Sequence, residues 1–92
     1  LLEQLDARPE GDGTMLDHSI VVLCSEVADG NTHQHHDLPI LVAGGGGGSI
    51  RGGRFFDMGH RAHGDLWTGL ARSMGSDIQH FGNAYSGPIS LA

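Results

Sequence analysis

A chain of 92 residues is long enough for one small domain, and a fold of this size buries only about 60 to 65 % of the surface that its unfolded chain exposes. The 16 glycines lower stability further, because glycine loses more backbone freedom on folding than any other residue and has no side chain to bury. The net charge of −6, with arginine as the only fixed cation among the side chains, argues against a surface that binds nucleic acid.

The first predicted element is a short helix. Leu1, Leu2 and Leu5 form an apolar stripe at helical spacing, and Pro9 ends the pattern. We therefore predict the last turns of a helix over residues 1–8.

Two apolar runs predict neighbouring strands. Residues 19–24 form a continuous β-branched and apolar run without alternation, which is typical of a central, parallel strand covered on both faces. Residues 38–43 form a second such run, with Pro39 near its start, where a missing amide donor costs least. We expect both strands to belong to one sheet.

The second half of the chain begins with a glycine run, residues 44–48, which must turn sharply or let other backbone approach closely. Residues 54–56 are predicted as a short edge strand. Asp65 is the expected cap of a helix that Gly75 ends. The apolar residues of this helix follow helical spacing: Leu66, Trp67, Leu70, Ala71 and Met74. Residues 76–92 are predicted to form a turn-rich covering loop.

This order of elements predicts an α/β fold with two to three strands and a helix at each end. So few strands leave sheet faces and edges exposed, so residues 1–92 are expected to be a single C-terminal segment of a larger α/β domain. The expected partner is the upstream part of the same polypeptide, and a homo-oligomer is the alternative. No apolar run approaches the roughly 20 residues that span a bilayer.

The connection between the two predicted strands, residues 25–37, is the main candidate for function. It exceeds the usual connection of about 4 to 6 residues, and long irregular loops are more often functional. Imidazole and carboxylate groups suit a divalent metal such as zinc, manganese or calcium. The candidate ligands are Glu26, Asp29, His33, His35 and His36.

Two interpretations of these histidines remain open. In an extended segment, His33 and His35 point to the same side and His36 to the other, which makes a chelating pair. The alternative is a set of exposed, hydrogen-bonding loop histidines, because the spacing matches no specific zinc signature.

Other motifs give weaker signals. Arg51 and Arg54 can clamp an anionic group, although such arginines more often form surface pairs. The glycine-rich segment does not fit a phosphate-binding loop, since its nearest such frame, Gly48 to Gly53, is followed by Arg54-Phe55 instead of lysine and a hydroxyl residue. Cys24 closes a strand and is expected to be inert packing rather than a nucleophile.

Several segments together resemble a known family. They are Pro9 to Asp17, Ser25-Glu26, Asp29 to Asn31, His33 to His36, Leu38-Pro39, Ala43 to Gly45, Met74-Gly75 and Phe81-Gly82. They resemble the C-terminal part of the bacterial domain-of-unknown-function family fifteen-fifty-two, which is grouped with alkaline-phosphatase-like and sulfatase-like proteins. The similarity covers nearly the whole chain.

The resemblance implies an alkaline-phosphatase-like α/β/α sandwich that continues upstream of Leu1, in bacterial proteins that are often exported. In the enzymatic relatives an Asp-His pair after a late strand binds metal, and another histidine precedes the next strand. Glu26 resembles the first position, and one of His33, His35 or His36 the last. Val27 follows Glu26, so the pair is broken, and the nucleophile of those relatives lies upstream.

The leading functional hypothesis is therefore the metal-site region of a phosphatase- or sulfatase-like hydrolase that is not catalytic alone. A metal held by Glu26 and the loop histidines would polarise a phosphate or sulfate ester. The alternative is a non-catalytic structural or binding domain that retains the fold.

Overall fold

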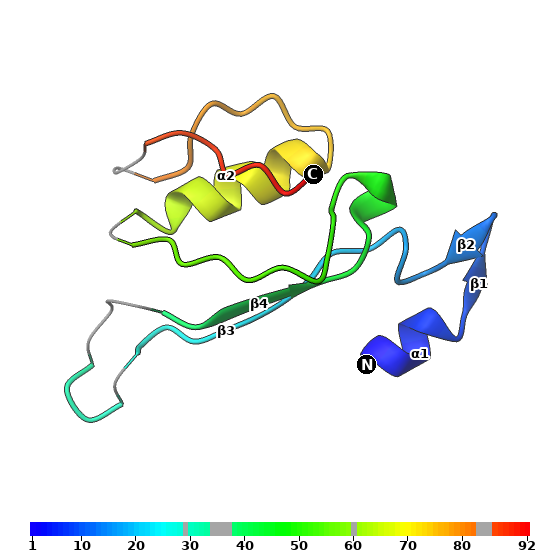
Figure 1. Cartoon of the computed structure of the whole chain (residues 1–92), viewed down its shortest axis with the longest axis horizontal. Coiled ribbons are helices and arrows are strands. Elements are labelled where there is room, and N and C mark those ends of the chain that lie inside the picture. Colours follow the sequence, from blue (N-terminus) through cyan, green and yellow to red (C-terminus); the bar gives the residue numbers. More distant parts are fainter. Residues whose placement is uncertain (29, 34–37, 60, 83–85) are drawn as a thin grey trace.

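The computed structural model describes residues 1–28, 30–33, 38–59, 61–82 and 86–92. It is a small mixed α/β arrangement with two short antiparallel sheets, which confirms the α/β class at this coarse level (Figure 1). The elements in chain order are α1 (Leu2–Asp6), β1 (Pro9–Glu10), β2 (Gly13–Thr14), β3 (Val21–Cys24), β4 (Ile40–Ala43), a 3-10 turn (Gly46–Gly48) and α2 (Gly64–Ser73).

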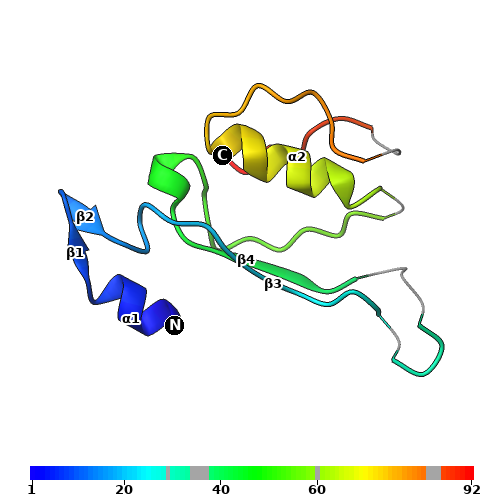
Figure 2. The same cartoon turned by 180° about the vertical axis from the view of Figure 1, so that it is seen from behind.

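The molecule is elongated, with extents of 44 × 32 × 19 Å. Its radius of gyration is 14.5 Å, whereas a compact chain of this length has a value of about 12 Å. Two views from opposite sides show the same three parts: α1 with β1 and β2, the β3–β4 hairpin, and α2 with the chain around it (Figures 1 and 2). Among the described residues only two hydrophobic side chains are buried, Leu70 and Leu91.

The N-terminal part contains the predicted helix, as α1, and a small hairpin that was not predicted. β1 and β2 pair antiparallel around a two-residue turn, with Glu10 opposite Gly13. Gly11, at the first turn position, has φ of 60°, which is the conformation that favours glycine in a type II′ turn.

The β3–β4 pair corrects the prediction of central parallel strands. The strands are antiparallel, with Val21 opposite Ala43 and Cys24 opposite Ile40. A parallel pair needs a crossover connection, usually a helix, that returns the chain to the same end of the sheet. Here the register of the ladder itself fixes the antiparallel direction. The strands are also not covered on both faces, because Leu23 is 70 % exposed and Leu41 is 54 % exposed.

The glycine run anchors the hairpin to the residues that precede β3. The amides of Gly45 and Gly46 donate to the carbonyls of Leu16 and Ser19, both at 3.0 Å. Gly44 has φ of 107°, and a Cβ atom there would collide with the Ser19 carbonyl. The prediction of a close backbone approach at residues 44–48 is therefore confirmed.

Helix α2 ends as predicted but does not begin as predicted. At the C-terminal end the amides of Gly75 and Ser76 donate to the carbonyls of Arg72 and Ala71, both at 3.0 Å. Gly75 has φ of 95°, so this is a Schellman motif. The expected cap, Asp65, instead lies inside the first turn, and His63 occupies the cap position without a side-chain cap bond.

The C-terminal tail covers α2, as predicted. The amide of Ile89 donates to the carbonyl of Asp65 at 3.2 Å, and the carbonyl of Leu91 accepts from the amide of Arg51 at 2.8 Å. Gly69 lets the tail approach, because a Cβ atom there would collide with the Ile89 carbonyl. Residues 54–56 form no strand, so that prediction was wrong.

Candidate functional site

The candidate metal loop lies at the free end of the β3–β4 hairpin, where its described part projects away from α2 (Figure 1). It begins with a local turn: the Ser25 hydroxyl donates to the carbonyl of Val27 at 2.7 Å, and the Val27 amide donates to the Ser25 hydroxyl at 3.3 Å. Glu26, between them, is exposed. The turn therefore leaves the Glu26 carboxylate on the surface, immediately after β3.

His33 has an unusual backbone. Its φ is 56°, and it is the only non-glycine residue with a positive φ in the described part of the chain. The side chain is exposed. The extended arrangement considered for His33 and His35 is therefore wrong at His33, because a left-handed residue does not continue the alternation of a strand.

The remaining candidate ligands, Asp29, His35 and His36, lie outside the described residues. Within the described ranges, no group of three or more histidine, cysteine, aspartate or glutamate side chains is placed to hold a metal ion. The structure therefore describes two members of the predicted ligand set, Glu26 and His33, both on the same exposed loop.

The two arginines predicted to bind an anion follow the glycine run, which leaves the C-terminal end of β4, whereas the loop precedes its N-terminal end. Arg54 donates from Nε to the carbonyl of Arg51 at 3.0 Å and from Nη2 to the carbonyl of Leu91 at 2.7 Å. Its guanidinium also lies 5.0 Å from the ring centre of Phe56. Arg54 thus ties its own segment to the tail, while the side chain of Arg51 is exposed.

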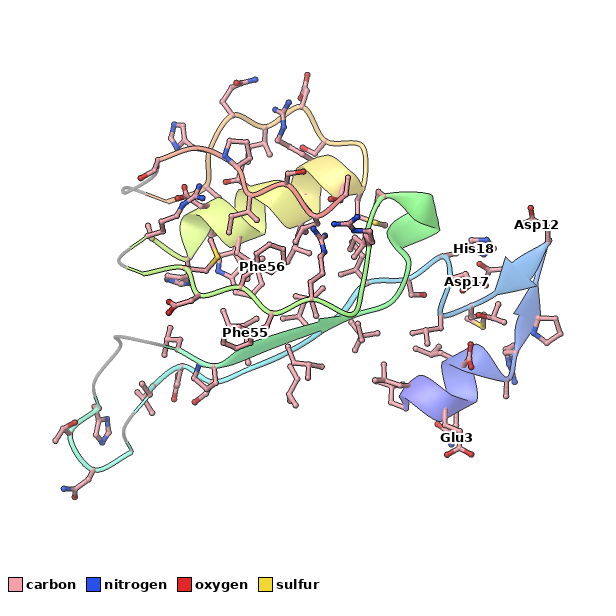
Figure 3. The ribbon with its side chains drawn as sticks, viewed as in Figure 1. Glu3, Asp12, Asp17, His18, Phe55 and Phe56 are labelled. Carbon is pink, nitrogen blue, oxygen red and sulfur yellow. The ribbon has the colours of Figure 1, made fainter. Side chains whose placement is uncertain are left out.

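Figure 3 shows Phe55 and Phe56 on the segment between α2 and β4. Phe55 is 91 % exposed and Phe56 is 45 % exposed.

The best-organised polar cluster of the described residues surrounds Asp65, which has no exposed surface. One carboxylate oxygen accepts from the amides of Ser86 and Gly87 at 2.9 and 3.3 Å, and the other accepts from Arg61 Nε at 3.1 Å. Arg61 in turn donates to the carbonyl of Gly87 at 2.7 Å.

This cluster sets the protonation of Asp65. The hydrogen bond from the Ser86 amide lowers the pKa of the Asp65 carboxyl below its ordinary value of 3.8, burial opposes it, and Arg61 and the Gly87 amide lower it further. The carboxylate therefore fastens residues 86–87 to α2. Sequence reasoning missed this role, although the i, i+4 spacing of Arg61 and Asp65 was visible.

A second polar cluster lies on the N-terminal part, where Figure 3 shows Asp12, Asp17 and His18. His18 Nδ1 lies 2.8 Å from a Glu10 carboxylate oxygen, and Nε2 lies 3.9 Å from Asp12. Asp17 accepts from the Thr14 amide at 2.9 Å. These contacts hold the β1–β2 hairpin against the residues that follow it.

Two open grooves lie on the surface of the described residues. One lies between α1 and the small hairpin and contacts Leu1, Arg8 and Met15. Another follows α2 and the tail and contacts Arg72 and Ser90. Neither groove includes a predicted metal ligand.

No family model matches this chain, and neither the curated proteins nor the solved structures contain a significant match. In the described part of the chain, no helix has the length and apolar character needed to cross a membrane. The proposals below therefore rest on the residues, on their geometry and on the resemblance described above.

Proposed function

We propose that this chain is a segment of a larger phosphatase- or sulfatase-like α/β protein, in which the loop over residues 25–37 contributes ligands to a divalent metal. The segment is not catalytic alone. The observation that carries the proposal is the backbone of His33, a non-glycine residue in a left-handed conformation on an exposed loop. Such conformations concentrate at functional sites and ligand clamps.

The chemistry of the loop supports metal binding. Glu26 supplies a carboxylate and His33 an imidazole, and both side chains are exposed to an entering ion. The loop also contains Asp29, His35 and His36, so the sequence offers more than the two ligands that are described. Zinc, manganese and calcium are the candidate ions, and carboxylate ligands favour the latter two.

The antiparallel hairpin is compatible with an alkaline-phosphatase-like sandwich if it lies at one edge. Many α/β sheets carry an antiparallel strand at the edge of an otherwise parallel sheet. In this chain both strands have exposed side chains, and each has an unpaired outer edge in the described structure. An upstream part of the same polypeptide would continue the sheet and cover it.

In that larger protein the metal would polarise a phosphate or sulfate ester. Of the two arginines, Arg51 has the exposed side chain, so Arg51 rather than Arg54 would bind the anionic group. The attacking residue belongs to the upstream part. Export from the cell is part of the same proposal, since it follows from the family resemblance alone.

Metal binding is tested by elemental analysis after dialysis against zinc, manganese or calcium. We expect about one ion per wild-type chain. Glu26→Gln and His33→Ala should each lower the affinity for the metal by about tenfold or more, because each removes one side chain that coordinates it directly. His80→Ala is the matched control, because His80 is also exposed but lies outside the loop. Absence of metal from the wild type, or equal binding by the loop variants, would overturn the proposal.

A non-catalytic structural or binding domain is the second candidate. It is favoured by the engagement of Arg54 with two carbonyl groups and by the openness of both grooves. Hydrolysis of phosphate and sulfate esters by a longer form of the protein, loaded with metal, separates the two. Turnover that depends on Glu26 supports the hydrolase, and inactivity with bound metal supports the binding domain.

A further inference from the structure

The single tryptophan of the chain is hydrogen-bonded to a histidine at the start of α2. Trp67 Nε1 donates to His63 Nδ1 at 2.9 Å. The two rings also meet edge to face, with their centres 6.2 Å apart and their planes at 80°. His63 holds the cap position and Trp67 lies four residues further on, a spacing that brings side chains together on a helix. The pair therefore spans the first turn of α2.

This hydrogen bond fixes where the proton of neutral His63 resides. The indole nitrogen of Trp67 keeps its hydrogen and can only donate, so the ring nitrogen that accepts from it is without a proton. Neutral His63 therefore carries its proton on Nε2. An imidazolium carries protons on both nitrogens and cannot accept, so protonation of His63 removes the acceptor of Trp67.

The exposure of the two rings suits a response to pH. His63 is exposed, so it exchanges protons freely with solvent, whereas Trp67 is half-buried. When Nδ1 gains a proton, two N–H donors face one another and the bond between the rings is lost. The indole N–H then requires another acceptor, because a polar group left unpaired is costly.

The charged groups around the pair have partners of their own. Among the described residues no carboxylate lies within ion-pair distance of His63. Asp57, before the helix, accepts from a backbone amide at 3.1 Å, and Asp65, within the helix, is paired with Arg61 at 3.1 Å. Residues 86–92, which lie against α2, contain no titratable side chain. The hydrogen bond with the indole is therefore the contact of the His63 ring that depends on its protonation.

Few other groups near α2 titrate in the same pH range as a histidine. Asp65 keeps its charge there, because its pKa lies below the ordinary value of 3.8, chiefly through the hydrogen bond from the Ser86 amide. The loop after α2 contributes Asp77 and His80, both exposed. His60 precedes the helix and lies outside the described residues. A control variant at each of these two histidines separates their titration from that of the pair.

We infer that His63 and Trp67 form a proton-sensitive latch on the first turn of α2. With His63 neutral, the indole is held against the imidazole, and with His63 protonated, the indole is released and its N–H bonds to water. Both states keep the helix, because α2 ends at Gly75 and is joined to the tail through Asp65. The inference goes beyond the proposed function, since it involves neither a metal nor a substrate.

Intrinsic fluorescence measures the state of the latch, because Trp67 is the only tryptophan of the chain. With a chelator present, we expect the emission of the wild-type chain to change in one step between about pH 5 and pH 8, where histidine titrates. The NMR signal of the indole N–H should move over the same range toward that of a water-exposed indole. His63→Asn should abolish both changes, since a carboxamide oxygen accepts at every pH and asparagine is a good helix cap.

Further variants distinguish the latch from other effects of pH. His63→Ala should hold the indole N–H signal at the low-pH position of the wild type at every pH, because alanine offers no acceptor. His60→Asn and His80→Asn are the matched controls and should keep the wild-type transition. Far-UV circular dichroism should stay constant over the same range, because the helix remains intact.

Three results would overturn the inference. The first is a wild-type emission that does not change between about pH 5 and pH 8. The second is a transition that survives in His63→Asn or is lost in either control variant. The third is a fall in ellipticity over the same pH range, which would mean that the fold responds to pH rather than the pair of side chains.

Discussion

The C-terminal half and the β3–β4 hairpin are held together in different ways. Around α2, the tail and the residues after the glycine run are joined by backbone and side-chain hydrogen bonds, and both buried hydrophobic side chains, Leu70 and Leu91, lie there. The hairpin has a regular strand ladder, yet Leu23 and Leu41 remain largely exposed. A ladder of backbone hydrogen bonds therefore gives the hairpin its shape, while no other described residue buries Leu23 or Leu41.

This difference concerns function as well as stability. The region with the buried side chains contains Asp65, Arg61 and Arg54, whose side chains hydrogen-bond to the tail or to one another. The candidate ligands Glu26 and His33 lie on the loop of the hairpin, which contributes neither of the two buried hydrophobic side chains. In this chain the described candidate metal ligands are separate from the side chains that hold the fold together.

The largest difference between the two regions is expected when a leucine is truncated in each. Leu70→Ala should lower the free energy of unfolding by about 3 kcal/mol, because it removes a buried side chain and leaves a cavity. Leu41→Ala should change it by less than about 0.5 kcal/mol, because more than half of that side chain is already exposed. Urea denaturation at low protein concentration measures both, and equal effects would contradict the comparison.

Local chemistry made part of the fold predictable from sequence. Helix α2 was identified from two local signals. Apolar residues recur at helical spacing from Leu66 to Met74, and Gly75 follows as a typical C-terminal end of a helix. The tail was recognised from its turn residues. The order of the remaining elements was enough for the α/β class.

Long-range pairing was not predictable in the same way. The run of β-branched residues at 19–24 predicted a strand correctly but a parallel partner incorrectly, because continuous apolar character reflects composition and does not fix strand direction. Asp65 was predicted as a helix cap because it directly precedes the apolar residues of α2. Its observed contacts with Ser86 and Gly87 join residues 21 and 22 positions apart, which local sequence patterns do not indicate. The sequence named five candidate ligands, of which Glu26 and His33 are described, but it gave no signal for the positive φ of His33.

A smaller effect is expected where the hairpin joins the rest of the molecule. Gly44→Ala should lower the free energy of unfolding by about 2 kcal/mol, because a left-handed backbone is strained for alanine and the added Cβ atom collides with the Ser19 carbonyl. Gly47→Ala is the matched control: Gly47 also has a positive φ, but a Cβ atom there has open space. This control should lose only about 1 kcal/mol.

Thermal melting of the two glycine variants distinguishes strain from collision. For a domain of this size each kcal/mol lowers the melting temperature by about 4 to 8 °C. If Gly44→Ala and Gly47→Ala melt together, the close approach of residues 44–46 to residues 16–19 does not contribute to stability.

The smallest expected effect is the pH dependence that comes from Asp65. Its pKa is lowered in the folded state, first by the Ser86 amide, so its contribution to stability is fully present above the unfolded value near 3.8 and is lost as the pH falls through the lowered folded pKa. Asp65→Asn should therefore flatten the acid side of the stability profile, below about pH 5, while the asparagine oxygen still accepts from the amides of Ser86 and Gly87. The midpoint of urea unfolding, measured between about pH 3 and pH 6, gives the change of stability with pH in the range where carboxyl groups titrate.

Asp77→Asn, which changes an exposed carboxylate after the same helix, is the control and should follow the wild type. A profile for Asp65→Asn as steep as that of the wild type would mean that the carboxylate bound to Ser86 and Gly87 does not fasten the tail, and the contrast between the two halves would then rest on Leu70 and Leu91 alone.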